Sequence, residues 1–198
     1  MPASAAVRLD RGNYAGQVNP ACTRGFAYYD CWGDDSRLVI ANAQDAAEKG
    51  ATVLTRTRCV RVDRRPLDWH VQFERSTGPR RTASAIVNAT GSWTADFLQN
   101  RAGVEPKRSM RLVKGSHIVI RRRYPGDHAY ILPNSDKWII FVIPYEDDFS
   151  LIGTTDVEWG GKPTDVSIDA EEIDYLCCAV NTWLRQQIAP LPKTRSIG

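Results

Sequence analysis

The sequence predicts an α+β fold in two lobes, the first with helices around a group of strands and the second with an antiparallel sheet and one long helix. Two observations predict it. The apolar spacing changes from helical to alternating near residue 51, and three strand-like runs separated by polar turns lie between residues 129 and 154. At 198 residues the chain matches one large or two small domains and can bury a substantial core.

The first element expected is a helix after an irregular start. About the first 24 residues show no clear period and read as a connecting segment. Asp35 or Ser36 can then cap a helix, and Lys49 and Gly50 end it with a cation in the last turn and a left-handed exit. The apolar face of this helix is Leu38, Val39, Ala43, Ala46 and Ala47.

Three strands and a short helix are expected next. Alternation over residues 53–60 predicts a strand, and further strands are expected at 69–74 and 82–88, joined by a turn at 77–79. A helix then runs from Ser92 to about Ala102 and is closed by Gly103. Its inward-facing residues are expected to be Trp93, Phe97 and Leu98.

The second lobe is expected to be a meander followed by the long helix. Its strands are expected at residues 116–120, 129–132, 137–143 and 150–154, with polar turns at 134–136 and 146–148. Asp169 caps the helix, with Glu172 at the position that closes a capping box. The buried stripe is Ile173, Leu176, Cys177, Val180, Leu184 and Ile188.

Composition excludes several classes of protein. The net charge of +3 and arginine clusters without interleaved aromatic residues argue against nucleic-acid binding. The longest apolar run, residues 138–143, is far too short to cross a bilayer, and no signal peptide opens the chain. The five cysteines show no C-x-x-C spacing and the three histidines no ligand spacing, so we expect reduced thiols in the cytoplasm and no metal site.

The stretch "AIVNATGSW" is the first candidate site. A strand that ends in Asn88, Ala89, Thr90 and Gly91 just before a helix exposes backbone amides where a phosphate is stabilised. Strand-to-helix turns also use such small residues for geometry alone. The local sequence therefore allows either a phosphate-binding turn or an ordinary one.

The stretches "VKGSHIVI" and "IGTTDVEWGG" are the other candidates. His117 lies at the start of an apolar strand and could act as a general base or be a core histidine satisfied by a carbonyl. Lys114 and Arg111 could attract an anionic substrate or be solvated. The hydroxyls of Thr154 and Thr155 suit either a ligand or a turn. The carboxylates Asp156 and Glu158 could be paired groups or surface charges.

Several runs in the same order resemble the FAD-dependent, membrane-associated glycerol-3-phosphate dehydrogenases. They are "RGFAYYDCW", "DDSRLVIANAQ", "GATVLTRTR", "IVNATGSW", "RLVKGSHIVI", "AYILPNSDKWIIFVIP" and "FSLIGTTDVEW", from Arg24 to about Thr182. "KGSHIV" and "IGTTDVE" are specific to this family and its close oxidase relatives, whereas "NATG" is shared widely among flavoproteins.

The resemblance implies a flavoprotein fold of the D-amino-acid-oxidase and glutathione-reductase type. Residues 25–105 would be part of an FAD-binding α/β domain without its first βαβ unit, and residues 106–198 a truncated antiparallel-sheet substrate domain, after the connecting segment 1–24. The cofactor-binding residues that it implies are Cys59, Val60, Ala89, Thr90, Gly91 and Trp93, those expected at the substrate are Lys114, Ser116 and Thr155, and the catalytic residue is His117.

The reaction that the resemblance implies is oxidation of sn-glycerol 3-phosphate to dihydroxyacetone phosphate. His117 would take or polarise the hydroxyl proton while a hydride passes from C2 to the flavin. Electrons would then leave to a quinone, with the parent protein peripheral on the cytoplasmic face of the inner membrane. Apolar surfaces left by missing elements are compatible with a homodimer.

Two departures from the family pattern bear on activity. The sequence has no G-x-G-x-x-G motif, and the family's Arg-bearing segment after the Gly that matches Gly198 is absent. We therefore expect an excised fragment that neither binds FAD tightly nor turns over substrate by itself. The alternatives are an oxygen-using glycerophosphate oxidase, an amine oxidase, which "KGSHIV" argues against, and a stand-alone non-catalytic module on the same scaffold.

Overall fold

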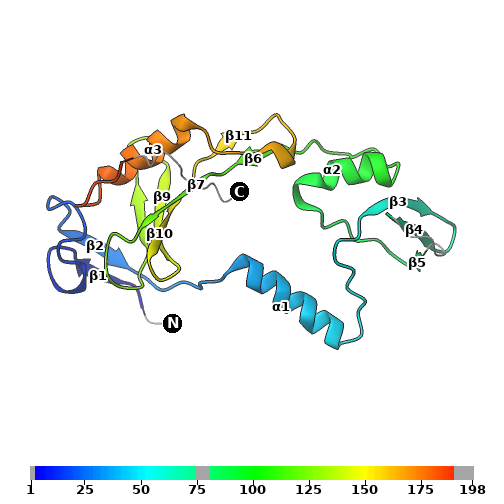
Figure 1. The fold of residues 1–198 in the computed structure, drawn as a ribbon, viewed down its shortest axis with the longest axis horizontal. Coiled ribbons are helices and arrows are strands. Elements are labelled where there is room, and N and C mark those ends of the chain that lie inside the picture. The colour runs from blue at the N-terminus through cyan, green and yellow to red at the C-terminus, as the bar shows by residue number, and fades with distance from the viewer. Residues whose placement is uncertain (1–2, 75–80, 190–198) are drawn as a thin grey trace. The chain divides into compact units, whose positions relative to one another are not determined.

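The computed structural model describes residues 3–74 and 81–189 and divides the chain into two compact units (Figure 1). The first unit joins Met1–Asp30 to Arg111–Gly198, and the second is Cys31–Met110. The division differs from the boundaries expected after residues 24 and 105. The N-terminal residues belong with the lobe that contains the meander.

A four-stranded antiparallel sheet forms the first unit. Its order is β7 (His117–Arg121), β10 (Phe149–Gly153), β9 (Ile139–Tyr145) and β8 (Tyr130–Pro133), so the predicted meander is confirmed. Side chains alternate between the two faces of the sheet. The buried face carries Ile118, Ile120, Tyr130, Leu132, Ile140, Val142 and Ile152.

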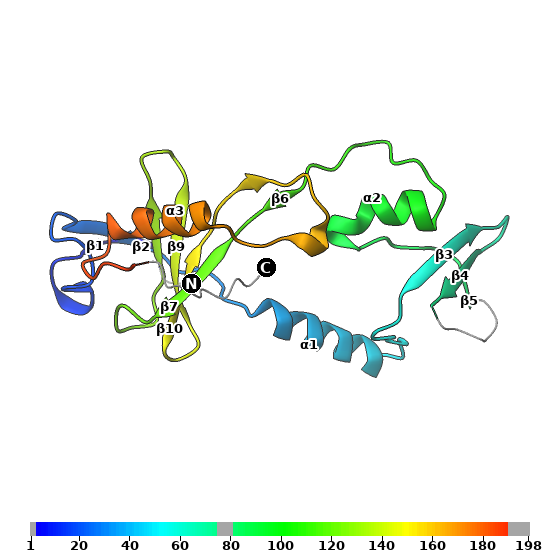
Figure 2. The ribbon, with the colours of Figure 1, turned by 45° about the horizontal axis from the view of Figure 1, so that its top comes forward.

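Helix α3 (Ala170–Asn181) runs across this buried face in both views (Figure 1 and Figure 2). Its predicted capping box is present, because Asp169 accepts from the Glu172 amide and Glu172 accepts from the Asp169 amide. The predicted stripe is largely confirmed, although the helix ends before its last two members. The stripe residues that are buried are Leu176, Cys177, Val180, Leu184 and Ile188.

The prediction of an irregular segment over residues 1–24 is wrong. Strand β1 (Ala5–Arg8) pairs with β2 (Arg24–Ala27), and a 3₁₀ turn occupies Gly12–Tyr14. Val18 is buried and forms a β-bridge with Leu184. These contacts are with distant residues, so the local sequence pattern does not show them.

The second unit contains helix α1 (Asp35–Glu48), which ends at Lys49 and Gly50 as predicted. Its N-cap is Asp34 instead of the expected Asp35 or Ser36, because the Asp34 side chain accepts from the Arg37 amide. Its apolar face buries no residue, and Leu38 and Val39 are more than half exposed. Among the described residues of this unit, the buried hydrophobic side chains are those of Val62 and Val71.

The predicted strands of the second unit form only in part. A three-stranded antiparallel sheet contains β3 (Cys59–Arg64), β4 (Trp69–Phe73) and β5 (Arg81–Ala83). Residues 53–58 and 84–88 are not strands, which corrects two expectations. A strand needs a neighbour for its backbone hydrogen bonds, and no described segment pairs with these two.

The predicted helix after residue 91 is present as three short helical pieces. A 3₁₀ turn at Gly91–Trp93 leads into α2 (Thr94–Asp96) and then a π-helical turn at Phe97–Arg101. Phe97 and Leu98 are half-buried, but Trp93 is exposed rather than facing inward. No helix in the described parts of the chain is long and apolar enough to span a bilayer.

Candidate functional site

The candidate site of the first unit lies where two short ladders meet. Strand β6 (Val113–Lys114) pairs with β11 (Val157–Glu158), and β7 pairs with β10 a few residues away. Lys114 stands opposite Val157 and His117 opposite Gly153, so two residues on one segment face three on the other. This one-residue mismatch between the two ladders is similar to that of a β-bulge, a feature that re-aims side chains and is frequent beside active sites.

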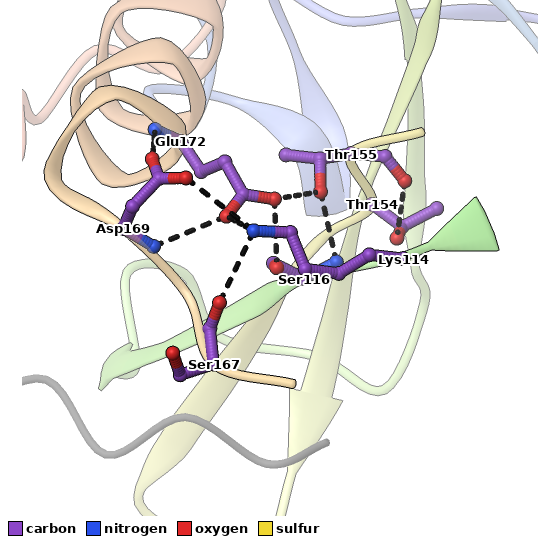
Figure 3. Close-up of polar contacts among 7 residues, drawn as sticks. All are labelled: Lys114, Ser116, Thr154, Thr155, Ser167, Asp169 and Glu172. Atoms are coloured by element: carbon purple, nitrogen blue, oxygen red, sulfur yellow. Dashed lines mark hydrogen bonds and ion pairs between the residues drawn. The ribbon is translucent and has the colours of Figure 1, made fainter. Parts of the chain in front are cut away.

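Glu172 closes this junction from the first turn of α3 (Figure 3). Its Oε1 accepts hydrogen bonds from the hydroxyls of Ser116 and Thr155, each at 2.8 Å. Its Oε2 lies 2.6 Å from Nζ of Lys114 and accepts from the Asp169 amide at 3.1 Å. Both carboxylate oxygens therefore take two donors each, which uses the acceptor capacity of the group.

Lys114 is held by three oxygens. Besides Glu172, its ammonium donates to the carbonyl of Ser167 at 3.1 Å and to Oδ2 of Asp169 at 3.3 Å. It also lies 5.4 Å from the centre of the Trp159 ring, within the range of a cation–π contact. The ammonium is therefore fully engaged inside the protein.

The charges of this cluster stabilise one another. The hydrogen bond to Glu172 raises the pKa of Lys114. Burial alone would raise the pKa of Glu172, but the hydrogen bonds from Lys114, Thr155, the Asp169 amide and Ser116 together lower it. Glu172 is therefore a carboxylate, and Lys114 an ammonium, throughout the neutral range.

His117 lies on the opposite, more open face of the sheet. Its neighbour across the ladder is Gly153, and a Cβ at Gly153 would stand only 2.6 Å from Nε2 of the His117 ring. The ring thus occupies the space that a side chain on Gly153 would fill. Burial lowers the pKa of His117, so the imidazole is neutral at pH 7 and can accept a proton.

Three residues expected at the substrate lie within this junction. Lys114, Ser116 and Thr155 are buried, and their polar groups bond to Glu172 and to one another. Thr155 also accepts from the Ser116 amide at 2.9 Å. These polar groups are therefore engaged within the protein, and Thr155 also lines the two hollows of the junction. Direct contact of the three residues with a substrate stays a prediction.

The segment after β10 is the part of the junction that is open to a ligand. Two hollows, of about 330 and 550 Å³, are both lined by Thr154, Thr155 and Asp156 together with Trp138. Gly115 lets the segment approach closely, because a Cβ there would stand 2.8 Å from Oγ1 of Thr154. The carboxylates of Asp156 and Glu158 are exposed.

The Asn88–Gly91 turn of the second unit has a geometry that fits a phosphate group. The Asn88 side chain accepts from the amide and the hydroxyl of Thr90 and donates to the carbonyl of Thr94. Gly91 has φ +55°, and nothing lies within 4 Å of where its Cβ would be. The amides of Gly91 and Ser92 form no hydrogen bond with any other residue of the described ranges.

The other residues expected at the cofactor lie in the same unit. Ala89, Thr90 and Trp93 are exposed around the turn. Cys59 and Val60 lie in β3, which packs against the π-helical turn at Phe97–Arg101. Burial raises the pKa of the Cys59 thiol, so the side chain is a neutral group. An open turn with two free amides suits the diphosphate of FAD.

Sequence reasoning missed Glu172 and Gly153 as functional residues. The signal for Glu172 was the capping box, which explains its hydrogen bond to the Asp169 amide but not its contacts to two strands. Gly153 had no signal, because the ring that requires it belongs to a partner strand. No group of metal-ligating side chains occurs in the described part of the chain.

A model of the FAD dependent oxidoreductase family matches residues 3–197. The chain is 45% identical to a glycerol-3-phosphate dehydrogenase of Pseudomonas aeruginosa over 96% of its length and 37% of that protein. It is 44% identical to the aerobic glycerol-3-phosphate dehydrogenase of Escherichia coli, over 96% of this chain and 38% of the relative. A D-erythritol 1-phosphate dehydrogenase of Brucella abortus is also 44% identical, over 95% of this chain and 38% of its own length.

Two solved structures are similar to this chain in fold. A glycerol-3-phosphate dehydrogenase from Bacillus halodurans in complex with FAD superposes with a TM-score of 0.67 and 27% identity, over 83% of this chain and 34% of that one. A glycine oxidase from Bacillus cereus superposes with a TM-score of 0.65 at 18% identity, over 91% and 48%, and shows the fold alone. The chain spans a little over a third of the length of the curated relatives that it matches.

Proposed function

Because the chain belongs to the FAD dependent oxidoreductase family, we propose that it is part of a flavoenzyme that oxidises sn-glycerol 3-phosphate to dihydroxyacetone phosphate. The observation that carries the proposal is 44–45% identity, over nearly the whole chain, to two glycerol-3-phosphate dehydrogenases. The half-buried, neutral His117 on the open face of the sheet gives that reaction its base.

In this proposal His117 of the first unit acts on the substrate, and residues of the second unit bind the cofactor. His117 accepts the proton of the C2 hydroxyl at a ring nitrogen, so that the alcohol becomes a ketone as its hydride leaves. FAD, when bound, accepts that hydride. Ala89, Thr90, Gly91 and Trp93 would hold the cofactor at the open turn, with Cys59 and Val60 of β3 beside them.

Lys114, Ser116 and Thr155 act in this scheme as supports of the strand that carries His117. Their polar groups are engaged with Glu172, which leaves the substrate contacts to other groups. The partly exposed Thr154 and the exposed Asp156, which line both hollows, are the residues of this junction that a substrate can reach.

Two phosphorylated polyols are candidates for the substrate, sn-glycerol 3-phosphate and D-erythritol 1-phosphate. The chain is 44% identical to a D-erythritol 1-phosphate dehydrogenase and 44–45% identical to the two glycerol-3-phosphate dehydrogenases. Both substrates are secondary alcohols that carry a phosphate, so the same base and the same hydride acceptor serve either one. A quinone as electron acceptor, a peripheral membrane location and a homodimer are further parts of the proposal.

The test compares steady-state oxidation of the two substrates by the natural protein. We expect sn-glycerol 3-phosphate to have the higher kcat/KM, and His117→Gln to lower kcat by about 10²- to 10⁴-fold. His70→Gln, in the other unit, is the matched control and should retain activity. A higher kcat/KM for D-erythritol 1-phosphate would make that compound the proposed substrate. Activity of His117→Gln equal to that of the wild type would contradict the role of His117 as the base.

A further inference from the structure

We propose that Glu172 is a positioning residue for His117. Its hydrogen bonds hold the two segments between the β6–β11 and β7–β10 ladders in register, and this register places the His117 ring against Gly153. The role of His117 as a base rests on the proposed function, whereas its placement rests on the contacts alone.

One oxygen atom joins the two segments of the junction. Oε1 of Glu172 accepts from the hydroxyl of Ser116, which directly precedes His117. The same oxygen accepts from the hydroxyl of Thr155, which lies two residues beyond Gly153. Both partners of the His117–Gly153 pair are therefore connected, through residues one and two positions away, to one buried carboxylate.

The junction needs such a lock because its register is irregular. Two residues face three, and the Ser116 amide donates to Oγ1 of Thr155 where a regular ladder would use a backbone carbonyl. A slip of one residue in an antiparallel pair moves every side chain to the other face of the sheet. His117 would then point toward α3 instead of the open face.

Gly153 also helps to place the His117 ring, because it has no side chain. The His117 ring lies where a Cβ on Gly153 would be, at 2.6 Å from Nε2, so the ring keeps its place only opposite a residue without a side chain. The register fixed by Glu172 is the one that brings these two residues together.

A carboxylate is required for this role. Four donors converge on Glu172, namely two hydroxyls, an ammonium and a backbone amide. Glutamine has a single acceptor oxygen and no negative charge. Its NH₂ group either meets the donor-only ammonium of Lys114 and the Asp169 amide, or faces the hydroxyls of Ser116 and Thr155, which must then turn to accept instead of donate. Glu172→Gln therefore weakens the hydrogen bonds and removes the charge at the junction, while it conserves the volume of the side chain.

The experiment uses Glu172→Gln and Gly153→Ala in the natural protein, with Asp174→Asn, an exposed residue of the same helix that lines neither hollow, as control. We expect both test variants to lower kcat about ten- to hundredfold with KM little changed, because the base is displaced while binding is retained. We also expect them to shift the NMR signals of the His117 ring, assigned by their loss in His117→Gln. The control should match the wild type in both measurements.

The two measurements separate this inference from the proposed function. Unchanged His117 signals in both folded test variants would overturn the positioning role, whatever the activity. Shifted signals in a protein that oxidises neither phosphorylated polyol would support the positioning role and overturn the proposed function. Ser116→Ala keeps the test decisive if Glu172→Gln does not fold, because it removes one hydrogen bond to Oε1 of Glu172 and leaves the ion pair with Lys114 intact. Unchanged His117 signals in a folded Ser116→Ala would overturn the positioning role.

Discussion

Nζ of Lys114 lies 2.6 Å from Oε2 of Glu172, and the exposed fractions of the two side chains are only 4% and 6%. The pair Lys49–Asp45 on α1 has the same 2.6 Å separation, but its side chains are 72% and 61% exposed. The two ion pairs therefore differ in burial and not in distance. Burial decides what the loss of one partner does to the protein.

Removal of one partner from the buried pair should be strongly destabilising. Lys114→Met leaves the Glu172 carboxylate buried without its cation, and we expect a loss of about 3–5 kcal/mol in the free energy of unfolding. Lys49→Met, the matched control, should change little, because its partner stays hydrated. The double variant Lys114→Met/Glu172→Gln should lose less than the sum of its singles. Denaturant unfolding of the wild type, the two singles, the double variant and Lys49→Met measures this, and additive losses would contradict the coupling.

The stability of the first unit should fall in acid. The pKa of Glu172 is lowered in the folded state, despite the opposing effect of its burial. Its contribution is therefore complete above the usual pKa of Glu, about 4.3, and is lost as the pH falls through the lower, folded-state pKa. Protonation of Glu172 also takes the partner from Lys114.

Melting curves between neutral and acidic pH measure this effect. Glu172→Gln has no carboxylate at this position, so its melting temperature should depend less on pH than that of the wild type. The exposed Glu171→Gln should keep the slope of the wild type. Parallel slopes for wild type and Glu172→Gln would contradict the linkage.

Much of the first unit could be predicted from the sequence, because its patterns are local. The polar turns of the meander and the capping box at Asp169 and Glu172 were both readable, and both are confirmed. Residues 5–8 and 24–27 could not be recognised as a hairpin, since their pairing and the Val18–Leu184 bridge depend on distant segments.

The second unit shows the opposite limit. Residues 53–58 and 84–88 carry strand-like alternation or apolar runs, yet neither forms a strand, and Val87 is 88% exposed. Apolar sequence alone does not make a strand without a partner for its backbone groups. In the candidate site, His117 was readable as a possible base, whereas the ring space opposite Gly153 is a tertiary feature.

The open turn should lose flavin when a side chain is placed on it. Gly91 and Gly103 have similar backbones, with φ of +55° and +61°, and neither has an atom within 4 Å of its Cβ position. Alanine at either position therefore carries a similar left-handed strain of about 1–2 kcal/mol. We expect Gly91→Ala to lower the flavin content of the purified natural protein and Gly103→Ala to retain it. Equal flavin loss in both would mean that strain, and not a contact at the turn, is responsible.

The most direct test of the central claim is the colour of the flavin. The purified, flavin-loaded natural protein is mixed without oxygen with sn-glycerol 3-phosphate, and the visible absorbance of oxidised flavin is followed. We expect rapid bleaching in the wild type and bleaching slowed by about 10²-fold or more in His117→Gln. A flavin that stays oxidised with both sn-glycerol 3-phosphate and D-erythritol 1-phosphate would contradict the account.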